Sequence, residues 1–483
     1  MEASLPISAA LSRAPARPAA APQLTAASVA SVKLPLVFML TGLGAMLFGC
    51  VWLAAQPDLL ATYHYNQYVV AATHLFVLGW LSSVVMGAMY QLVPVALETK
   101  LFSQTLAKVQ FACHLIGFIG MVWMFDRWNM KQVGHFGCIM FLGVGLFVYN
   151  LVRTLLRVPR WTITATGVAA SLAWLSLTVT AGLCLATAKC SYEAADSAST
   201  ATWVGALLHG LRSVGSFMTH FDAISAMHAH AHMGVLGFFT ILIVGVSYKL
   251  VPMFTLGEVQ CRHRAGLSLL LLNIGVAGAF TSILLRSRWK MAFTLLIVLA
   301  LAIYGWELIE ILRARKRRAV DWGVKMFLGA VCLLALESLL AVVLSWPRLP
   351  LNGFTGQLEN LYGFLGLLGF VSLAVIGMLY KIVPFLVWFG TYSAKVGFSQ
   401  VPSLSELYST RLQKAGFAFY ACGLLVSGAG IVMAHGLLVR GGALLLCFGV
   451  ATLLLNIGLM LRHFFRPQLK PLPTRAVAMP KSL

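Results

Sequence analysis

Charged side chains are scarce in this sequence, and acidic ones are the scarcest. Only 10% of its 483 residues are charged, and Asp and Glu together number 14. Soluble domains carry about 25% charged residues. This composition excludes an ordinary soluble enzyme. The lack of clustered carboxylates inside the apolar stretches also argues against a chain of acidic proton carriers.

Cysteine and histidine patterns typical of zinc or redox sites are also missing. The nine cysteines include no Cys-x-x-Cys pair, so neither a zinc ribbon nor a redox dithiol of the usual spacing is supported. The His-Glu-x-x-His motif of zinc hydrolases is absent as well. Most cysteines fall in apolar stretches, where we expect them to pack as small hydrophobic side chains.

Long apolar stretches, in contrast, recur from end to end. The sequence is 60% hydrophobic with a mean hydropathy of +0.87, and many stretches reach the roughly 20 residues that cross a bilayer as a helix. They are too long and too uniformly apolar for barrel strands. We predict an all-α integral membrane protein with twelve transmembrane helices, at residues 34–55, 68–95, 106–125, 134–156, 163–187, 226–253, 265–285, 291–312, 324–345, 358–389, 412–434 and 438–461.

The rest of the chain is divided around this membrane domain. Residues 1–33 are rich in Ala, Pro and Ser and are predicted to form a disordered cytoplasmic tail rather than a cleaved signal. Residues 34–461 are predicted to be a single membrane domain, and residues 462–483 a second cytoplasmic tail. The outer segment 190–225 is predicted to contain a surface helix lying against the bilayer.

The formal net charge of +21 is explained by membrane orientation rather than by nucleic acid. Lys and Arg are concentrated in the two tails and in the loops after every second helix, most densely in "RARKRR" at 313–318. By the positive-inside rule, both termini are expected in the cytoplasm. We therefore expect the lipid bilayer as the main partner, no nucleic acid, and the inner (plasma) membrane of a bacterium as the location.

An internal repeat organises the twelve helices. Residues 74–94 ("HLFVLGWLSSVVMGAMYQLVP"), 232–252 ("HMGVLGFFTILIVGVSYKLVP") and 364–384 ("FLGLLGFVSLAVIGMLYKIVP") align without a gap. They share two glycines eight residues apart, a tyrosine and a closing Val-Pro. These segments lie four helices apart, which predicts three four-helix repeats related by a pseudo-threefold axis. The repeats span about 34–156, 163–312 and 324–461. The shared glycines indicate close helix packing or room for a flat ligand.

Four histidines at the outer ends of the repeated helices are the candidate ligands. His74 and His232 occupy the same repeat position, and Phe364 replaces them in the third repeat. A helix turns 100° per residue, so His228 and His232 share one face while His230 points almost oppositely. Imidazole nitrogen suits haem iron or copper. The pattern therefore predicts ligation in two different clefts.

The remaining polar residues near the helices have simpler interpretations. We expect some histidines to be hydrogen-bonded to neighbours, namely His114, His135, His435 and His463. We assign the others to loops or interfaces without a special role, namely His64, His209, His220 and His263. Lys249 and Lys381 follow the repeated tyrosine and are expected to reach the cytoplasmic headgroups, with a proton-uptake mouth as the alternative.

The second predicted helix resembles a known family. The segment "ATHLFVLGWLSSVVMGAMYQLVPVAL" at 72–97 is similar to the second helix of subunit I of the haem–copper oxidases (cytochrome c oxidase subunit I). The resemblance implies twelve helices in three groups of four and makes His74 an axial ligand of a low-spin haem, b-type being expected.

The chain also departs from that family. The family's His-x-His pair in the tenth helix is absent from 358–389, and its adjacent histidine pair after the seventh helix is absent from 285–291. A complete binuclear oxygen-reducing centre is therefore not expected, and copper remains an open question. We predict instead a bis-histidine haem between His74 and the helix at 226–253.

Several functions are compatible with this ligand set. The favoured one is a haem-binding redox protein that transfers electrons, binds a diatomic gas (O2 or NO), or both. A non-catalytic scaffold subunit of a respiratory complex and a haem- or copper-handling transporter are alternatives. The chain also resembles the NnrS family of nitric-oxide-response membrane proteins. Other respiratory subunits or a periplasmic cytochrome c are candidate partners. An oxidoreductase activity is left open, because no catalytic residue is identified.

Overall fold

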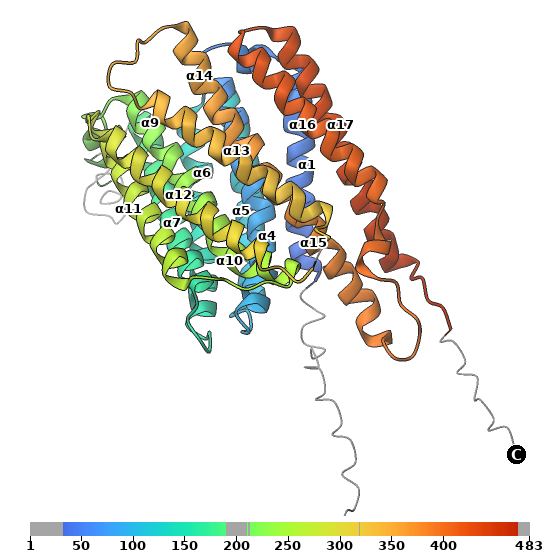
Figure 1. Ribbon diagram of the computed structural model, residues 1–483. Helices are drawn as coiled ribbons and strands as arrows, with labels where there is room; N and C mark the ends of the chain where they lie inside the picture. Colours follow the sequence, from blue (N-terminus) through green and yellow to red (C-terminus); the bar gives the residue numbers. More distant parts are fainter. Residues whose placement is uncertain (1–31, 190–209, 211–212, 318, 472–483) are drawn as a thin grey trace, which may run out of the picture.

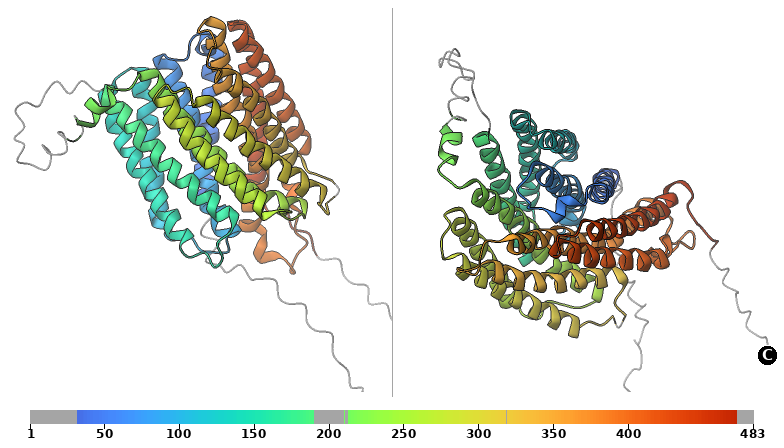
Figure 2. Two further views of the ribbon diagram at one scale, coloured as in Figure 1. Left: turned by 60° about the vertical axis from the view of Figure 1, so that its left-hand side comes forward. Right: turned by 90° about the horizontal axis from the view of Figure 1, so that it is seen from above.

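The computed structural model describes residues 32–189, 210, 213–317 and 319–471. Most of the predicted N-terminal tail and most of the predicted surface helix at 190–225 lie outside these residues. Within them, twelve helical segments are long and apolar enough to cross a membrane, and each corresponds to one predicted helix. Figure 1 shows them as one elongated bundle, and Figure 2 gives two further views.

The helices are α1 (Lys33–Ala55), α3, η2 and α4 (Gln67–His74, Leu75–Ser82, Ser83–Ala96), α5 (Gln104–Asp126), α6 (Met130–Leu155), α7 (Ile163–Lys189), α9, η3 and α10 (Ala223–His232, Met233–Thr240, Ile241–Thr255), α11 (Arg262–Leu284), α12 (Lys290–Arg313), α13 (Trp322–Leu344), α14, η4 and α15 (Gly353–Phe364, Leu365–Val371, Ser372–Tyr392), α16 (Thr410–Val432) and α17 (Gly436–Phe465).

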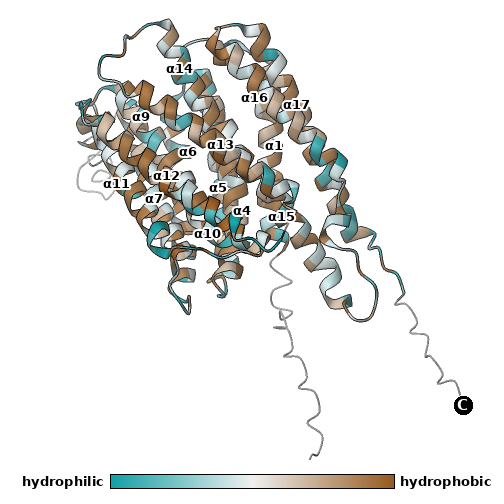
Figure 3. Ribbon diagram, viewed as in Figure 1, coloured by the Kyte–Doolittle hydropathy of each residue, from teal (hydrophilic) through white to brown (hydrophobic). Residues whose placement is uncertain are grey.

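The protein is therefore an all-helical integral membrane protein, as predicted. Apolar residues cover the length of the helices, and hydrophilic residues gather mainly towards helix ends and loops (Figure 3). All eight described cysteines are free. The last helix ends at Phe465, several residues beyond its predicted end.

The bundle has two distinct ends. The helix α1 begins and α17 ends at the lower end in Figure 1, which we call the terminal end. The opposite end holds His64 in the loop before α3, together with the beginnings of α9 and α14, and we call it the histidine end. A chain that crosses an even number of times returns to the side from which it started, so the helix count and this arrangement agree.

Glycines of the repeated helices lie against the first helix of each predicted repeat. A Cβ on Gly245 of α10 would be 2.7 Å from the Cα of Gly167 in α7, and one on Gly377 of α15 would be 2.6 Å from the carbonyl oxygen of Gly323 in α13. Gly87 of α4 is equally close to α1. No side chain fits at these distances, so at these positions the glycines serve close helix packing.

The contact between Gly245 and Gly167 leads to a stability prediction. Gly245→Ala places a methyl group against backbone atoms that cannot rotate away, so we expect unfolding to become easier by about 1–3 kcal/mol. Gly305→Ala in α12 is the matched control, because nothing lies within 4 Å of the added Cβ and alanine favours a helix by about 1 kcal/mol. Thermal unfolding in detergent measures both; equal midpoints for the two variants would contradict the prediction.

Each repeated helix contains a π-helical segment at the same repeat position. The segments η2, η3 and η4 begin directly after His74, His232 and Phe364, respectively. A π-helical turn leaves a backbone carbonyl without its usual N–H partner, and a side-chain hydroxyl takes the place of that partner. The Thr240 hydroxyl donates to the Val235 carbonyl at 2.9 Å. Ser83 and Ser372 make the equivalent bond to the carbonyl five residues earlier in the other two helices. Such π-turns are frequent at functional sites.

One lysine at the terminal end is paired with a carboxylate. Lys381 of α15 forms an ion pair with Asp321, just before α13, and lies over the ring of Phe254. The prediction that Lys381 reaches the headgroups did not include this carboxylate from a neighbouring segment, which is close enough to neutralise the lysine. The repeated prolines also do not end their helices, since α15 continues past Pro384 to Tyr392.

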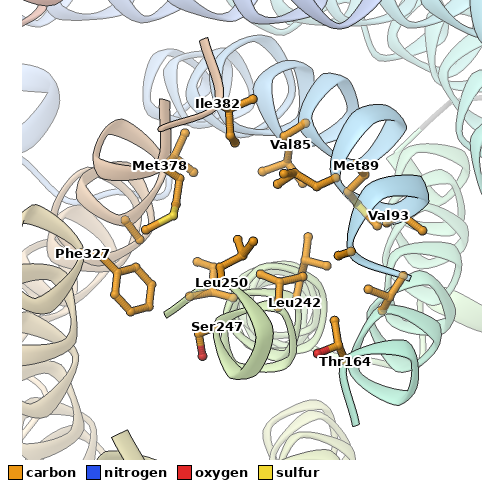
Figure 4. Close-up of a pocket in the computed structure, with 18 of the residues that line it drawn as sticks. Val85, Met89, Val93, Thr164, Leu242, Ser247, Leu250, Phe327, Met378 and Ile382 are labelled. Atoms are coloured by element: carbon orange, nitrogen blue, oxygen red, sulfur yellow. The ribbon is translucent and has the colours of Figure 1, made fainter. Parts of the chain in front are cut away.

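A cavity lies among the three repeated helices in their halves nearer the terminal end. Its volume is about 90 Å³, and it is open on one side. Figure 4 shows Met89 of α4, Leu250 of α10 and Met378 of α15 facing it, with Phe327 of α13 and Thr164 of α7 at its edge. Its lining is apolar and contains no histidine. The candidate ligands therefore lie outside this cavity, in the other halves of the same helices.

Candidate functional site

The four predicted ligand residues all lie at the histidine end. His74 is the last residue of α3, and the other three lie in the last two turns of α9. As the helical spacing predicts, the α9 histidines diverge. His228 and His232 contact residues in or beside α14, on one side of the helix, whereas His230 faces α7 on the other.

His74 and His230 approach the same region from two different helices. The Nδ1–H of His74 donates to the Val70 carbonyl at 2.8 Å, and the ring packs on Phe125 with centroids 4.4 Å apart. The ring of His230 lies against Gly182, where a Cβ would be 2.9 Å from its Cε1 atom. The two imidazoles are near enough to interact electrostatically. Two helices thus present one histidine each to a shared region.

Available nitrogen atoms make this pair suitable for a metal-centred cofactor. Because Nδ1 of His74 carries the proton, its Nε2 has a free lone pair, which is the form that binds iron. It makes no hydrogen bond to any residue that the structure describes. The buried Nδ1 of His230 likewise has no hydrogen-bond partner. Buried polar atoms are rarely left unpaired, so the donor set fits a haem held by two imidazoles.

His232 lies in a second region, between α9 and α14. Its Nδ1–H donates to the His228 carbonyl at 2.7 Å, the same bond to the residue four positions earlier that His74 makes. Its ring stacks on Tyr362, with centroids 5.8 Å apart and planes inclined by 26°. Nearby, Glu337 of α13 is buried and its Oε1 has no hydrogen-bond partner. A Cβ on Gly366 would be 3.0 Å from that oxygen.

The third repeat supplies no imidazole at the equivalent position. Phe364 is 5% exposed and belongs to the apolar core. His232 is therefore the single candidate ligand of its region, whereas His74 and His230 form a pair of candidate ligands. The two regions thus differ in their number of candidate ligands.

The structure also reveals a cluster that the sequence prediction missed. His64, assigned above to an unremarkable loop, has its Nε2 atom 2.9 Å from Nε2 of His228. Its Nδ1 lies 3.0 Å from Oδ1 of Asn360. One potential ligand atom each from His64, His228 and Glu359 lies within 4.8 Å of the others. His64 follows no helical periodicity, so only its proximity in the fold indicates this role.

Electrostatics favour neutral histidine in this cluster. Burial lowers the pKa of His64, and the hydrogen bond to Asn360 opposes that shift only in part. Since an ordinary histidine has a pKa of about 6.5, His64 is neutral at pH 7. A neutral imidazole is the form that binds metals.

The four histidines that were predicted to be hydrogen-bonded to neighbours behave as expected. His114 bonds to the Ser83 hydroxyl at 2.9 Å and His463 to the Tyr392 hydroxyl at 2.7 Å. His135 contacts Gln132, and His435 accepts a bond from the backbone of Leu438. These four predictions are confirmed.

Comparison with protein families gives one match. The family described as cytochrome c and quinol oxidase polypeptide I matches residues 19–126, a stretch that includes α1, the second membrane helix with His74, and α5. The resemblance to subunit I of the haem–copper oxidases is thereby confirmed for this part of the chain. No match is found among curated proteins. The relation to the NnrS family stays a prediction.

Proposed function

We propose that this haem–copper oxidase-like membrane protein is a haem-binding redox protein in which His74 and His230 hold one b-type haem. The observation that carries the proposal is that the imidazoles of α3 and α9 lie near enough to interact electrostatically, with Nε2 of His74 left free by the bond of its Nδ1–H and Nδ1 of His230 without a hydrogen-bond partner. A bis-histidine ligand set is typical of haems that carry electrons rather than bind gases, because both axial positions are filled.

The chain's own residues orient the ligands in this proposal. The Val70 carbonyl fixes the tautomer and direction of His74, and the Phe125 ring limits its rotation. Gly182 leaves space beside His230 that a side chain would fill. When bound, the haem supplies one-electron chemistry. The surrounding apolar helices exclude water, which influences the potential at which it accepts an electron.

The second region supports gas binding as a further element of this function. His232 is a single candidate ligand with Nε2 directed away from its bonded Nδ1. A one-sided ligand set leaves room for a diatomic gas such as O2 or NO. Tyr362 stacks on His232, so its ring keeps the imidazole oriented. Neither histidine set requires copper, and the metal analysis described below measures whether copper is bound.

We also propose that the bundle is three four-helix repeats around a pseudo-threefold axis, with both termini in the cytoplasm of a bacterial cell. Equivalent glycine contacts and equivalent π-segments in the three repeated helices support the repeats. The concentration of Lys and Arg in the loops of the terminal end supports the orientation. Other respiratory subunits or a periplasmic cytochrome c would then be the electron partners.

A non-catalytic scaffold is the second candidate, and Phe364 favours it. In that function the third repeat has lost its ligand and the remaining histidines hold no haem. The two candidates differ in one measurable property, which is the cofactor content of the protein.

The test is an optical spectrum of detergent-purified protein, oxidised and dithionite-reduced, with iron and copper analysis on the same sample. A sharp reduced α-band at one haem per chain is expected for the His74–His230 site. Carbon monoxide or nitric oxide is then added to the reduced protein, and a shift of the spectrum would indicate a second site with an open position. Protein purified with neither haem nor copper would refute the proposal and support the scaffold.

A further inference from the structure

The cluster at the histidine end joins three segments that are far apart in the sequence. His64 comes from the loop before α3, His228 from α9 and Glu359 from α14. The nitrogen atoms of the two histidines are 2.9 Å apart, and a carboxylate oxygen of Glu359 completes a group within 4.8 Å. This group is distinct from the His74–His230 pair, and His232 adjoins it through the bond of its Nδ1–H to the His228 carbonyl.

Asn360 determines which nitrogen of His64 faces the cluster. Its amide nitrogen donates to the Thr62 carbonyl at 2.6 Å and to the Gln357 side chain at 3.1 Å. Its oxygen is therefore the atom that meets Nδ1 of His64, at 3.0 Å, and it can only accept. Nδ1 of His64 must carry the proton, and Nε2 presents a lone pair towards His228.

This bond is the usual support of a metal-binding histidine. Metal-ligating histidines almost always donate their second ring N–H to a carbonyl or carboxylate, which fixes the tautomer and the ring direction. Asn360 supplies that acceptor, and it is itself 6% exposed and held by the backbone of the loop. The orientation of His64 therefore exists before any ligand arrives.

Glu359 adds a negative charge without a direct partner. Its carboxylate makes no hydrogen bond or ion pair with the residues that the structure describes. Lys290 of α12 is near enough to interact electrostatically, but its ammonium group donates to the Leu344 carbonyl at 3.1 Å. A carboxylate that faces two imidazole nitrogens and lacks a bonded cation is well placed to accept one.

We propose that His64, His228 and Glu359 bind a divalent transition metal ion such as Zn²⁺. Ligand atoms about 2.0–2.1 Å from a tetrahedral metal lie roughly 3.3 Å from one another, so the three atoms need to move only slightly. Two histidines and one carboxylate are a common set for zinc and for non-haem iron, and they leave a position open. The ion links the loop before α3 to α9 and α14.

Metal binding to purified full-length protein tests this proposal. After removal of metals with a chelator, Zn²⁺ titrated in a calorimeter is expected to bind at one per chain and to raise the unfolding temperature. His64→Ala and Glu359→Gln each remove one ligand and should weaken binding more than tenfold. Asn360→Leu removes only the support of His64 and should weaken binding about 10–100-fold.

The matched control is His135→Ala, which removes an exposed histidine at the same end of the bundle. It should bind Zn²⁺ as the unmodified protein does. Wild-type protein that binds no Zn²⁺, or binding that persists unchanged in His64→Ala and Glu359→Gln, would overturn the proposal. The haem spectrum of each variant is recorded in parallel. Because His74 and His230 lie apart from the cluster, an unchanged spectrum shows that the fold is intact and separates this test from that of the haem.

Discussion

Replacement of His74 by alanine is expected to remove the reduced α-band of the purified protein almost completely. His74→Ala deletes an imidazole whose orientation is fixed by the bond to Val70 and which would hold the haem in this proposal, and a single remaining histidine would not keep a low-spin haem. His230→Ala should have the same effect, because its ring approaches from the other helix. The measurement is the haem-to-protein ratio and the reduced-minus-oxidised spectrum of each variant.

The remaining histidines provide the controls for this experiment. His232→Ala should leave the α-band intact, since His232 packs on Tyr362 in the other region. His135→Ala, in an exposed position, should also leave the α-band unchanged. An α-band that survives in His74→Ala but disappears in His232→Ala would refute the assignment of the haem to the His74–His230 pair.

Replacement of Glu307 by alanine is expected to cause the largest loss of stability. Its carboxylate is 0% exposed and accepts bonds from Arg264 at 2.8 Å and from the backbone of Gln260 and Cys261 at 2.6 and 2.9 Å. Removing one partner of a buried ion pair costs roughly 3–5 kcal/mol. Arg264 is 24% exposed, so water compensates it in part and we expect about 3 kcal/mol. Unfolding of the detergent-solubilised protein measures the change.

A neighbouring glutamate of α12 makes this prediction specific. Glu310 pairs with Arg313 at 2.7 Å, but the arginine is 73% exposed and the glutamate 29%, and ion pairs that water reaches contribute less than about 1 kcal/mol. Glu310→Ala should therefore unfold nearly as the unmodified protein does. An equal loss of stability in both variants would contradict the prediction, because the bonds of Glu307 to the loop after α10 would then contribute nothing specific.

The helices and the candidate histidines were predictable because both depend on local sequence. A run of apolar residues long enough to cross a bilayer forms a helix wherever it lies in the bundle, so all twelve were identified. The opposite directions of His228 and His230 follow from the helical turn alone. The shared glycines indicated close contact, although the partner helix of each could not be read from the pattern.

Contacts between distant segments could not be predicted in the same way. Nothing near His64 in the sequence distinguishes it from other loop histidines, and its partners His228, Glu359 and Asn360 become neighbours only when α9, α14 and the loop before α3 assemble. The ion pair of Lys381 could not be predicted for the same reason, because Asp321 reaches it from the loop before α13. The π-segments were also missed, since hydrophobic periodicity does not reveal one wide turn.

The location of the histidines at one end of the bundle has an electrical consequence. Moving one elementary charge across a whole membrane changes its energy by about 2.3 kcal/mol per 100 mV of membrane potential. If the proposed haem is held there, an electron delivered from the histidine end would cross only a small part of the thickness, so the voltage would hardly change the driving force of its transfer. A proton that came from the terminal end would instead traverse most of the field, past an apolar cavity without titratable groups.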